Sequence, residues 1–152
     1  FEGTPLYPFG YGLTYGDVSM TKVSCAGCET TKAGEKMAVS LDVKENFEIK
    51  VTVSNNSDKT LQEVVQVYVK ANGTDLAAYG GKLCAFKRVE VAANETKEIS
   101  LCIDKKAFTV ADMDGKMVVA GTDFTFSVGF GQPDARTKEL TGKDVFLVQA
   151  NA

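Results

Sequence analysis

The sequence of 152 residues contains no histidine, no tryptophan and only three prolines. Without histidine the chain cannot build a Ser-His-Asp or Cys-His catalytic site, a histidine-ligated zinc site or a histidine general base. Without tryptophan it lacks the side chain on which most sugar-binding β-sandwiches depend. No apolar run approaches the roughly 20 residues of a membrane-spanning helix, so we expect no membrane partner.

The net charge and the length of the chain limit the partners and the number of domains that it can have. The formal net charge of −3 disfavours a nucleic acid or an anionic membrane as partner, because either needs a basic surface. A chain of this length with 44% hydrophobic residues can bury a core without a metal or a disulfide, and we expect one domain. The chain begins at Phe1 without a leader pattern, and we expect it to be a segment of a longer polypeptide.

Four cysteines, Cys25, Cys28, Cys84 and Cys102, are the candidate metal or redox residues. Cys25 and Cys28 have C-x-x-C spacing, but no helix is expected after them to lower a thiol pKa. A four-cysteine zinc site would need a second close pair, so we expect no metal and no cofactor. Cys84 and Cys102 fall in apolar strands and are interpreted as buried free thiols. A disulfide across the turn from Cys25 to Cys28 stays open and would need an oxidising compartment.

Apolar and polar residues alternate over most of the chain, with turn residues between the alternating segments. This pattern predicts short half-buried strands and no helix. The segments 25–36, 72–81 and 131–142 are expected to be loops. The expected strands and short apolar segments are 17–23, 37–43, 47–53, 64–69, 83–91, 98–103, 107–110, 117–119, 122–129 and 145–148. The chain is therefore predicted to be all-β, a two-sheet antiparallel immunoglobulin-like sandwich.

Two of the expected strands show irregular alternation. In the strand 17–23 the pattern is lost after Thr21. In the strand 83–91 the apolar anchors are Phe86, Val89 and Val91. Because Phe86 and Val89 differ in parity, we expect a bulge or a bend between them.

Several short motifs are interpreted as turns. The segment 112–115 lacks the third acidic position and the final glutamate of an EF-hand calcium loop, so a hairpin turn with a left-handed Gly115 is expected instead. The N-glycosylation sequons that begin at Asn55, Asn72 and Asn94 fit turns equally well. No pair of carboxylates stands out as a catalytic dyad.

Residues 1–16 differ in character from residues 17–152, which we expect to form the sandwich domain. In the first segment aromatic side chains are interleaved with glycine and proline, which permits neither a regular helix nor a long strand. We expect a rigid strap that packs on a protein surface, with the packing residues Tyr7, Phe9, Tyr11, Leu13 and Tyr15. The alternative is an exposed aromatic platform that stacks on sugar rings.

These motifs resemble a known family. The segment Pro5-Leu-Tyr-Pro-Phe-Gly-Tyr-Gly-Leu-Thr-Tyr15 is similar to the one that leads into the C-terminal fibronectin type III-like domain of family 3 glycoside hydrolases, the β-glucosidase and β-xylosidase family. Further motifs resemble that domain in the same order: Val51–Ser57, Glu63–Val69, Leu83–Val89 and Phe124–Gly129. Ala85 and Asn94 stand where the family usually has glycine, a difference that concerns only local backbone geometry.

The resemblance implies a fibronectin type III-like sandwich with no catalytic residue, because the family's catalytic aspartate and glutamate lie in other domains. The parent would be a retaining β-glycosidase that hydrolyses terminal β-D-glucosides or β-xylosides. This chain would pack in cis on the catalytic domains and stabilise them. The alternatives are a carbohydrate-binding module and a protein-binding adhesion module. Cysteines within strands favour a bacterial cytoplasmic location, with a periplasmic or secreted one as the alternative.

Overall fold

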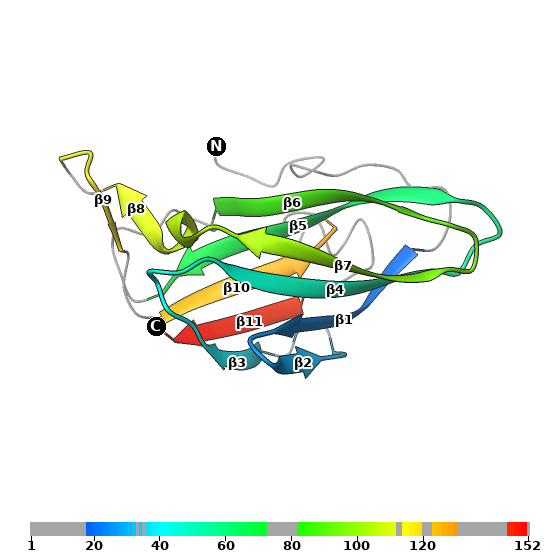
Figure 1. Ribbon diagram of the computed structural model, residues 1–152, viewed down its shortest axis with the longest axis horizontal. Helices are drawn as coiled ribbons and strands as arrows, with labels where there is room; N and C mark the ends of the chain where they lie inside the picture. The colour runs from blue at the N-terminus through cyan, green and yellow to red at the C-terminus, as the bar shows by residue number, and fades with distance from the viewer. Residues whose placement is uncertain are drawn as a thin grey trace, which may run out of the picture.

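The computed structural model describes residues 18–32, 34, 36–72, 82–111, 114–119, 123–130 and 146–151, which form two layers of β-strands (Figure 1). The predicted all-β sandwich is confirmed. The strands are β1 Val18–Cys25, β2 Cys28–Thr30, β3 Lys36–Ser40, β4 Phe47–Asn55, β5 Leu61–Ala71, β6 Lys82–Val91, β7 Thr96–Ile103, β8 Thr109–Ala111, β9 Met117–Val119, β10 Asp123–Gly129 and β11 Phe146–Asn151. A 3-10 turn, η1 Lys105–Phe108, precedes β8.

One sheet has the strand order β2-β1-β4-β7, and the other has the order β3-β11-β10-β5-β6. All paired strands run antiparallel except β3 and β11, which are parallel neighbours. The predicted antiparallel sandwich thus contains one parallel pair, at this edge. β3 follows β1 and precedes β4 in sequence, but it crosses to the other sheet and pairs there with β11, the C-terminal strand. The strands β8 and β9 form a separate hairpin at one end of the sandwich (Figure 1).

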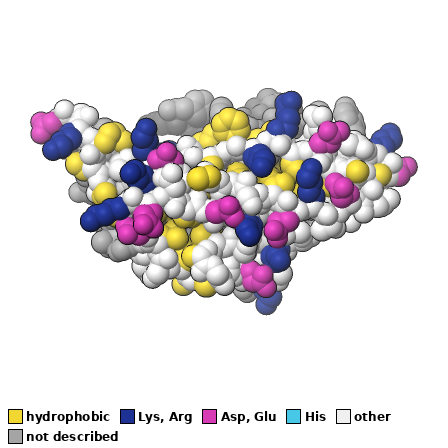
Figure 2. All heavy atoms as spheres, viewed as in Figure 1, with side chains coloured by type: hydrophobic (Ala, Val, Ile, Leu, Met, Phe, Trp, Pro, Cys, Tyr) yellow, Lys and Arg dark blue, Asp and Glu magenta, His cyan; other side chains and the backbone are white. Residues whose placement is uncertain are grey.

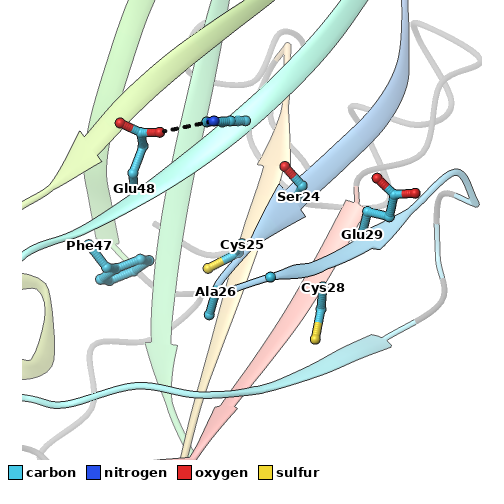
Figure 3. Close-up of a pocket in the computed structure, with 9 residues that line it drawn as sticks. Ser24, Cys25, Ala26, Cys28, Glu29, Phe47 and Glu48 are labelled. Atoms are coloured by element: carbon cyan, nitrogen blue, oxygen red, sulfur yellow. Dashed lines mark ion pairs between the residues drawn. The ribbon is translucent and has the colours of Figure 1, made fainter.

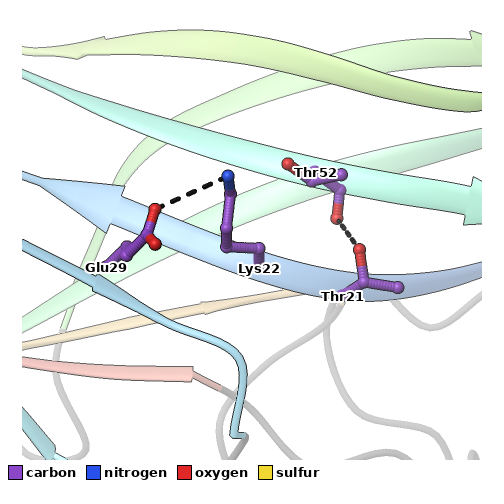
Figure 4. Close-up of polar contacts among 4 residues, drawn as sticks. All are labelled: Thr21, Lys22, Glu29 and Thr52. Atoms are coloured by element: carbon purple, nitrogen blue, oxygen red, sulfur yellow. Dashed lines mark hydrogen bonds and ion pairs between the residues drawn. The ribbon is translucent and has the colours of Figure 1, made fainter.

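A bulge explains the irregular alternation in β1. Met20 pairs with Val53 and Lys22 with Thr52, so Thr21 is the extra residue. An extra residue reverses the parity of the strand, and Val23 and Cys25 therefore face the core beyond it. The Thr21 hydroxyl donates to the Thr52 carbonyl at 3.4 Å, which ties the bulge to β4 (Figure 4).

The predicted loop 25–36 is wrong in part, because β2 lies within it and β3 begins at its last residue. Ala26 and Gly27 both have positive φ, 51° and 81°, and form a two-residue hairpin turn. The predicted strand 37–43 in turn ends at Ser40. It stops there because the Asp42 carboxylate accepts the backbone N–H of Lys44 at 2.8 Å and starts a turn.

The core lies between the two sheets and consists of the side chains that point inward from alternate positions of the strands. Its largest fully buried side chains are Phe108, Phe124, Phe126, Ile49, Ile103, Val18, Val23, Val51, Val53, Val65, Val67 and Val91. The segment 107–110 was expected only as a short apolar piece, and it divides between η1 and β8. The rings of Phe108 and Phe124 meet edge to face with centroids 4.9 Å apart.

The opposite end of the sandwich carries the β4–β5 and β6–β7 connections (Figure 1). The Asn55 backbone N–H donates to the Glu95 carbonyl at 2.9 Å, and the Asn94 N–H donates to the Ser57 carbonyl at 3.1 Å. Asn94 has a φ of 58°, the left-handed region that favours glycine and tolerates asparagine. The two sheets are thereby joined at this end. Among the described residues, no helix is long and apolar enough to cross a bilayer.

Candidate functional site

The five strap residues proposed for interdomain packing, Tyr7, Phe9, Tyr11, Leu13 and Tyr15, lie outside the described residues. The site is therefore built from the sandwich itself. Among its described residues, four large hydrophobic side chains are exposed: Leu83, Phe86, Met117 and Val119. We call these four residues the exposed apolar set.

Phe86 is the most exposed member of this set, with 69% of the residue's surface accessible. Its partner across the ladder is Gln66 of β5. Residues that pair directly across two strands share a face of the sheet. Since Val65 and Val67 point into the core, Gln66 and Phe86 lie on the outer face of the five-stranded sheet.

Phe86, expected as one of the three apolar anchors of this strand, therefore does not anchor it in the core. The register runs without interruption from the pair Leu61–Val91 to the pair Val67–Ala85, so the expected bulge between Phe86 and Val89 is also absent. The register shift falls instead at Cys84, between Ala85 and Leu83. Phe86 and Val89 differ in parity because they lie on opposite faces of a regular strand: Val89 faces the core and Phe86 faces outward.

The outer face next to Phe86 also holds two buried polar side chains. Gln66 and Tyr68 are each 5% exposed although their strand positions point away from the core. The Tyr68 hydroxyl donates to Gln66 Oε1 at 2.8 Å. This hydrogen bond satisfies the polar ends of the two buried side chains.

The other exposed apolar residues lie towards the β8–β9 end. Leu83 lies near the start of β6, and Met117 and Val119 lie on β9. The Lys82 Nζ donates to the Thr109 carbonyl at 2.6 Å, which holds the start of β6 beside β8. On the side of the molecule that Figure 2 presents, hydrophobic side chains are scattered among positive and negative ones, without a large region of one charge.

The four cysteines are free thiols and differ in exposure. Cys25 is buried, Cys28 and Cys102 are exposed, and Cys84 is intermediate. The interpretation of Cys102 as buried is wrong, because it alternates with the inward Leu101 and Ile103 of β7. Burial raises the pKa of Cys84 to about 12. Burial, with a smaller contribution from the neighbouring Cys28, raises the pKa of Cys25 to about 11.

An open depression of about 490 Å³ lies at the β1–β2 turn and is lined in part by Cys25, Cys28, Phe47 and Glu48 (Figure 3). Phe47 is half-buried, and its ring meets Phe126 edge to face with centroids 5.2 Å apart. The Phe47 ring therefore packs against the core, and little of its face is open to a sugar. The described residues contain no cluster of three or more cysteine, aspartate or glutamate side chains suited to a metal ion.

The three sequons differ in their surroundings. Asn55 is 1% exposed, and its side-chain amide donates to the carbonyls of Lys59 at 2.7 Å and Val91 at 2.9 Å. Its nitrogen is therefore inaccessible to a glycosylating enzyme. The Asn72 amide donates to the Thr125 hydroxyl at 2.9 Å, whereas Asn94 is exposed at its turn. Gly115 has a φ of 80°, which confirms the expected left-handed glycine of the turn before β9.

The sheet order and the family comparison define the class of the domain. The model of the fibronectin type III-like domain family matches residues 63–132. The structure of a beta-glucosidase from Listeria innocua in complex with isofagomine superposes with a TM-score of 0.73 and 23% identity, over 97% of this chain and 18% of that one. At this identity the likeness supports the fold.

Sequence relatives make the assignment more specific. A beta-xylosidase from Formosa agariphila is 32% identical over 149 residues, which cover 93% of this chain and 18% of that protein. An exo-alpha-(1->6)-L-arabinopyranosidase from Bifidobacterium longum is 34% identical over 102 residues, covering 67% of this chain and 12% of that protein. The chain belongs to the fibronectin type III-like domains of family 3 glycoside hydrolases. It spans less than a fifth of the length of these relatives.

Proposed function

We propose that the chain is a non-catalytic accessory domain of a β-glycosidase, which packs in cis on the catalytic domains and stabilises them. The observation that carries the proposal is the coverage: nearly the whole chain aligns with a beta-xylosidase of which it is only 18%. The parent would be a retaining enzyme that acts on terminal β-D-glucosides or β-xylosides. Its catalytic residues would lie outside this chain, which would need no cofactor.

The outer face of the five-stranded sheet is the surface proposed for this packing. Phe86 is a large apolar group on a rigid sheet, and burying it against a second domain would be favourable. Residues 1–16 would form the strap between the domains, and residues 17–152 the sandwich. Phe86 is followed on β6 by Lys87, Arg88 and Glu90, and such mixed charges suit an interface between two domains better than an interface with nucleic acid.

Under this proposal the strap aromatics divide between two surfaces. Some of Tyr7, Phe9, Tyr11 and Tyr15 would pack on the sandwich, and the others would pack on the catalytic domain. An experimental structure of the full-length parent tests this division. If all four side chains are buried against the sandwich alone, the strap is only the N-terminal clasp of this domain.

An activity assay tests the non-catalytic part of the proposal. The isolated chain is expected to show no turnover of aryl β-glucosides or aryl β-xylosides, whereas the parent enzyme hydrolyses at least one of them. Appreciable turnover by the isolated chain would contradict the proposal.

The packing part is tested with Phe86→Ala in the parent enzyme. Loss of a buried interfacial ring is expected to weaken the interface by about 1–2 kcal/mol and to speed thermal inactivation of the glycosidase. The same change should leave the unfolding free energy of the isolated chain within about 0.5 kcal/mol, because the ring is exposed there. Glu98→Ala, at an exposed strand position in the other sheet, is the control and should change neither quantity. Equal inactivation rates for Phe86→Ala and the unchanged parent would argue against this face.

The carbohydrate-binding alternative has a separate test. Titration of the isolated chain with cello- and xylo-oligosaccharides is expected to show no binding. Binding that is lost in Tyr7→Ala or Tyr11→Ala would favour a carbohydrate-binding module over the packing role.

A further inference from the structure

The turn between β1 and β2 places two cysteines opposite each other. Cys25 and Cys28 are direct ladder partners, separated only by Ala26 and Gly27. Opposed residues of an antiparallel pair have Cα atoms about 4.5–5.5 Å apart and side chains on the same face. A disulfide needs a Cα separation of about 4.4–6.8 Å, so the backbone already satisfies this requirement.

The two thiols differ in access. Cys28 is exposed, whereas only 3% of Cys25 is accessible. In Figure 3 the Cys25 sulfur is turned toward the side of Phe47, and the Cys28 sulfur points away from it. Rotation about the two Cα–Cβ bonds is therefore needed before the sulfurs can bond. The open depression at this turn leaves Cys28 accessible to a small reagent.

We propose that Cys25 and Cys28 form a reversible disulfide by exchange with a low-molecular-weight disulfide such as oxidised glutathione. The Cys28 thiolate attacks one sulfur of the reagent, which forms a mixed disulfide and releases one glutathione thiolate. The Cys25 thiol loses its proton to solvent, and its sulfur attacks the Cys28 sulfur and releases the second glutathione thiolate. The two protein thiols are oxidised, and one glutathione disulfide is reduced to two thiols.

The order of these steps follows from the surroundings of each sulfur. The raised pKa of Cys25, about 11, makes it a slow nucleophile toward a reagent in solution. Its position opposite Cys28 makes the second step intramolecular, which compensates for the low thiolate fraction. Cys102 is also exposed but has no ladder partner that is a cysteine, since it pairs with Glu48. Cys102 should therefore stop at the mixed disulfide.

The bond would fix the edge of the four-stranded sheet. β2 is an edge strand of three residues, held to β1 by three ladder pairs. The ion pair between Lys22 of β1 and Glu29 of β2, at 3.6 Å, also joins the two strands (Figure 4). It is partly exposed to solvent and therefore weak. A covalent link across the turn would oppose fraying of this short strand.

The test uses the whole chain and oxidised glutathione as the probe, followed by blocking of free thiols, trypsin digestion and mass spectrometry. Cleavage after Lys22 and Lys32 places both cysteines in the single peptide 23–32. The expected result is loss of two hydrogen atoms from this peptide, while the peptide with Cys102 carries bound glutathione. Glutathione that persists on Cys28, or thiols that stay reduced in this peptide, would overturn the proposal.

Two variants and one condition complete the test. Cys25→Ser should leave glutathione on Cys28, whereas Cys102→Ser, the matched control at an exposed strand position, should leave the disulfide unchanged. Because a C-x-x-C peptide can also close when unfolded, the oxidation equilibrium is measured in buffer and in guanidinium chloride. The native equilibrium constant should be about tenfold larger, since the folded hairpin has already aligned the pair. A native constant equal to or below the unfolded one would contradict a site built by the fold.

Discussion

Asn55 is the side chain that contributes most polar contacts at one end of the sandwich. Its amide donates to two carbonyls, and its Oδ1 accepts the Ser57 backbone N–H at 2.9 Å and the Ser57 hydroxyl at 2.7 Å. One of these carbonyls belongs to Val91, at the end of β6 in the other sheet. The residue thus links the β4–β5 connection to both layers.

Asn55→Ala is expected to lower the free energy of unfolding by about 2–4 kcal/mol, because buried carbonyl groups lose their donors. Chemical denaturation followed by circular dichroism measures the change. The neighbouring Asn56→Ala is the matched control, and its effect should stay within about 0.5 kcal/mol because Asn56 is exposed. A loss of less than about 1 kcal/mol in Asn55→Ala would show that water replaces these contacts.

Ala26 has a backbone conformation that does not suit its side chain. Its φ of 51° is in the left-handed region, which is unfavourable for alanine by about 1 kcal/mol. Ala26→Asn should therefore raise the free energy of unfolding by about 0.5–1 kcal/mol, since Asn-Gly is the preferred pair for this type of turn. Ala26→Val should lower it by at least about 1 kcal/mol. Measured changes of the same sign for the two variants would contradict the turn conformation.

At the scale of elements, η1 fills the open end of the core. The Asp104 carboxylate accepts the Lys106 backbone N–H at 2.9 Å and caps the turn, which fixes Phe108 over the sheets. Phe108 is fully buried, and its ring also lies near Phe47 and Phe126, with centroids 5.7 Å and 5.8 Å away. This short turn therefore contributes two buried side chains, Ala107 and Phe108, to the core.

Phe108→Ala is expected to lower the free energy of unfolding by about 3–5 kcal/mol, because it removes a large buried side chain and leaves a cavity. Urea denaturation measures this loss. Phe86→Ala makes the same chemical change at an exposed site and should cost less than about 0.5 kcal/mol. Similar losses in the two variants would mean that Phe108 is not part of the core.

At the scale of the whole molecule, one hydrophobic cluster includes buried residues from both sheets and from η1. Because the strands share this cluster, neither sheet should remain folded without the other. The isolated chain is expected to unfold in one cooperative transition, with the same urea midpoint by circular dichroism and by tyrosine fluorescence. Two separated midpoints would show that the layers unfold independently.

Alternation predicted most strands because sandwich strands expose one face and bury the other. The strand 117–119 was predicted with its observed bounds, and the strand 122–129 was placed to within one residue. Prediction failed where contacts distant in sequence decide the structure. β2 is three residues long, so its sequence carries too little pattern, and the pairing of Cys25 with Cys28 creates it. β3 was predicted as a strand, but its parallel partner β11 is more than 100 residues away in sequence.

The sequence by itself determined the sandwich class, most strand positions and the family, because these depend on local alternation and on motifs in a fixed order. Only the tertiary structure decided which face each ambiguous residue takes. Phe86 looks like a core residue in sequence, yet the uninterrupted ladder with β5 turns it outward. Cys25 and Cys28 looked like part of a loop, and the hairpin turn makes them ladder partners. The physical reason is that the register of a strand pair assigns every side chain to a face, and register is set by the partner strand.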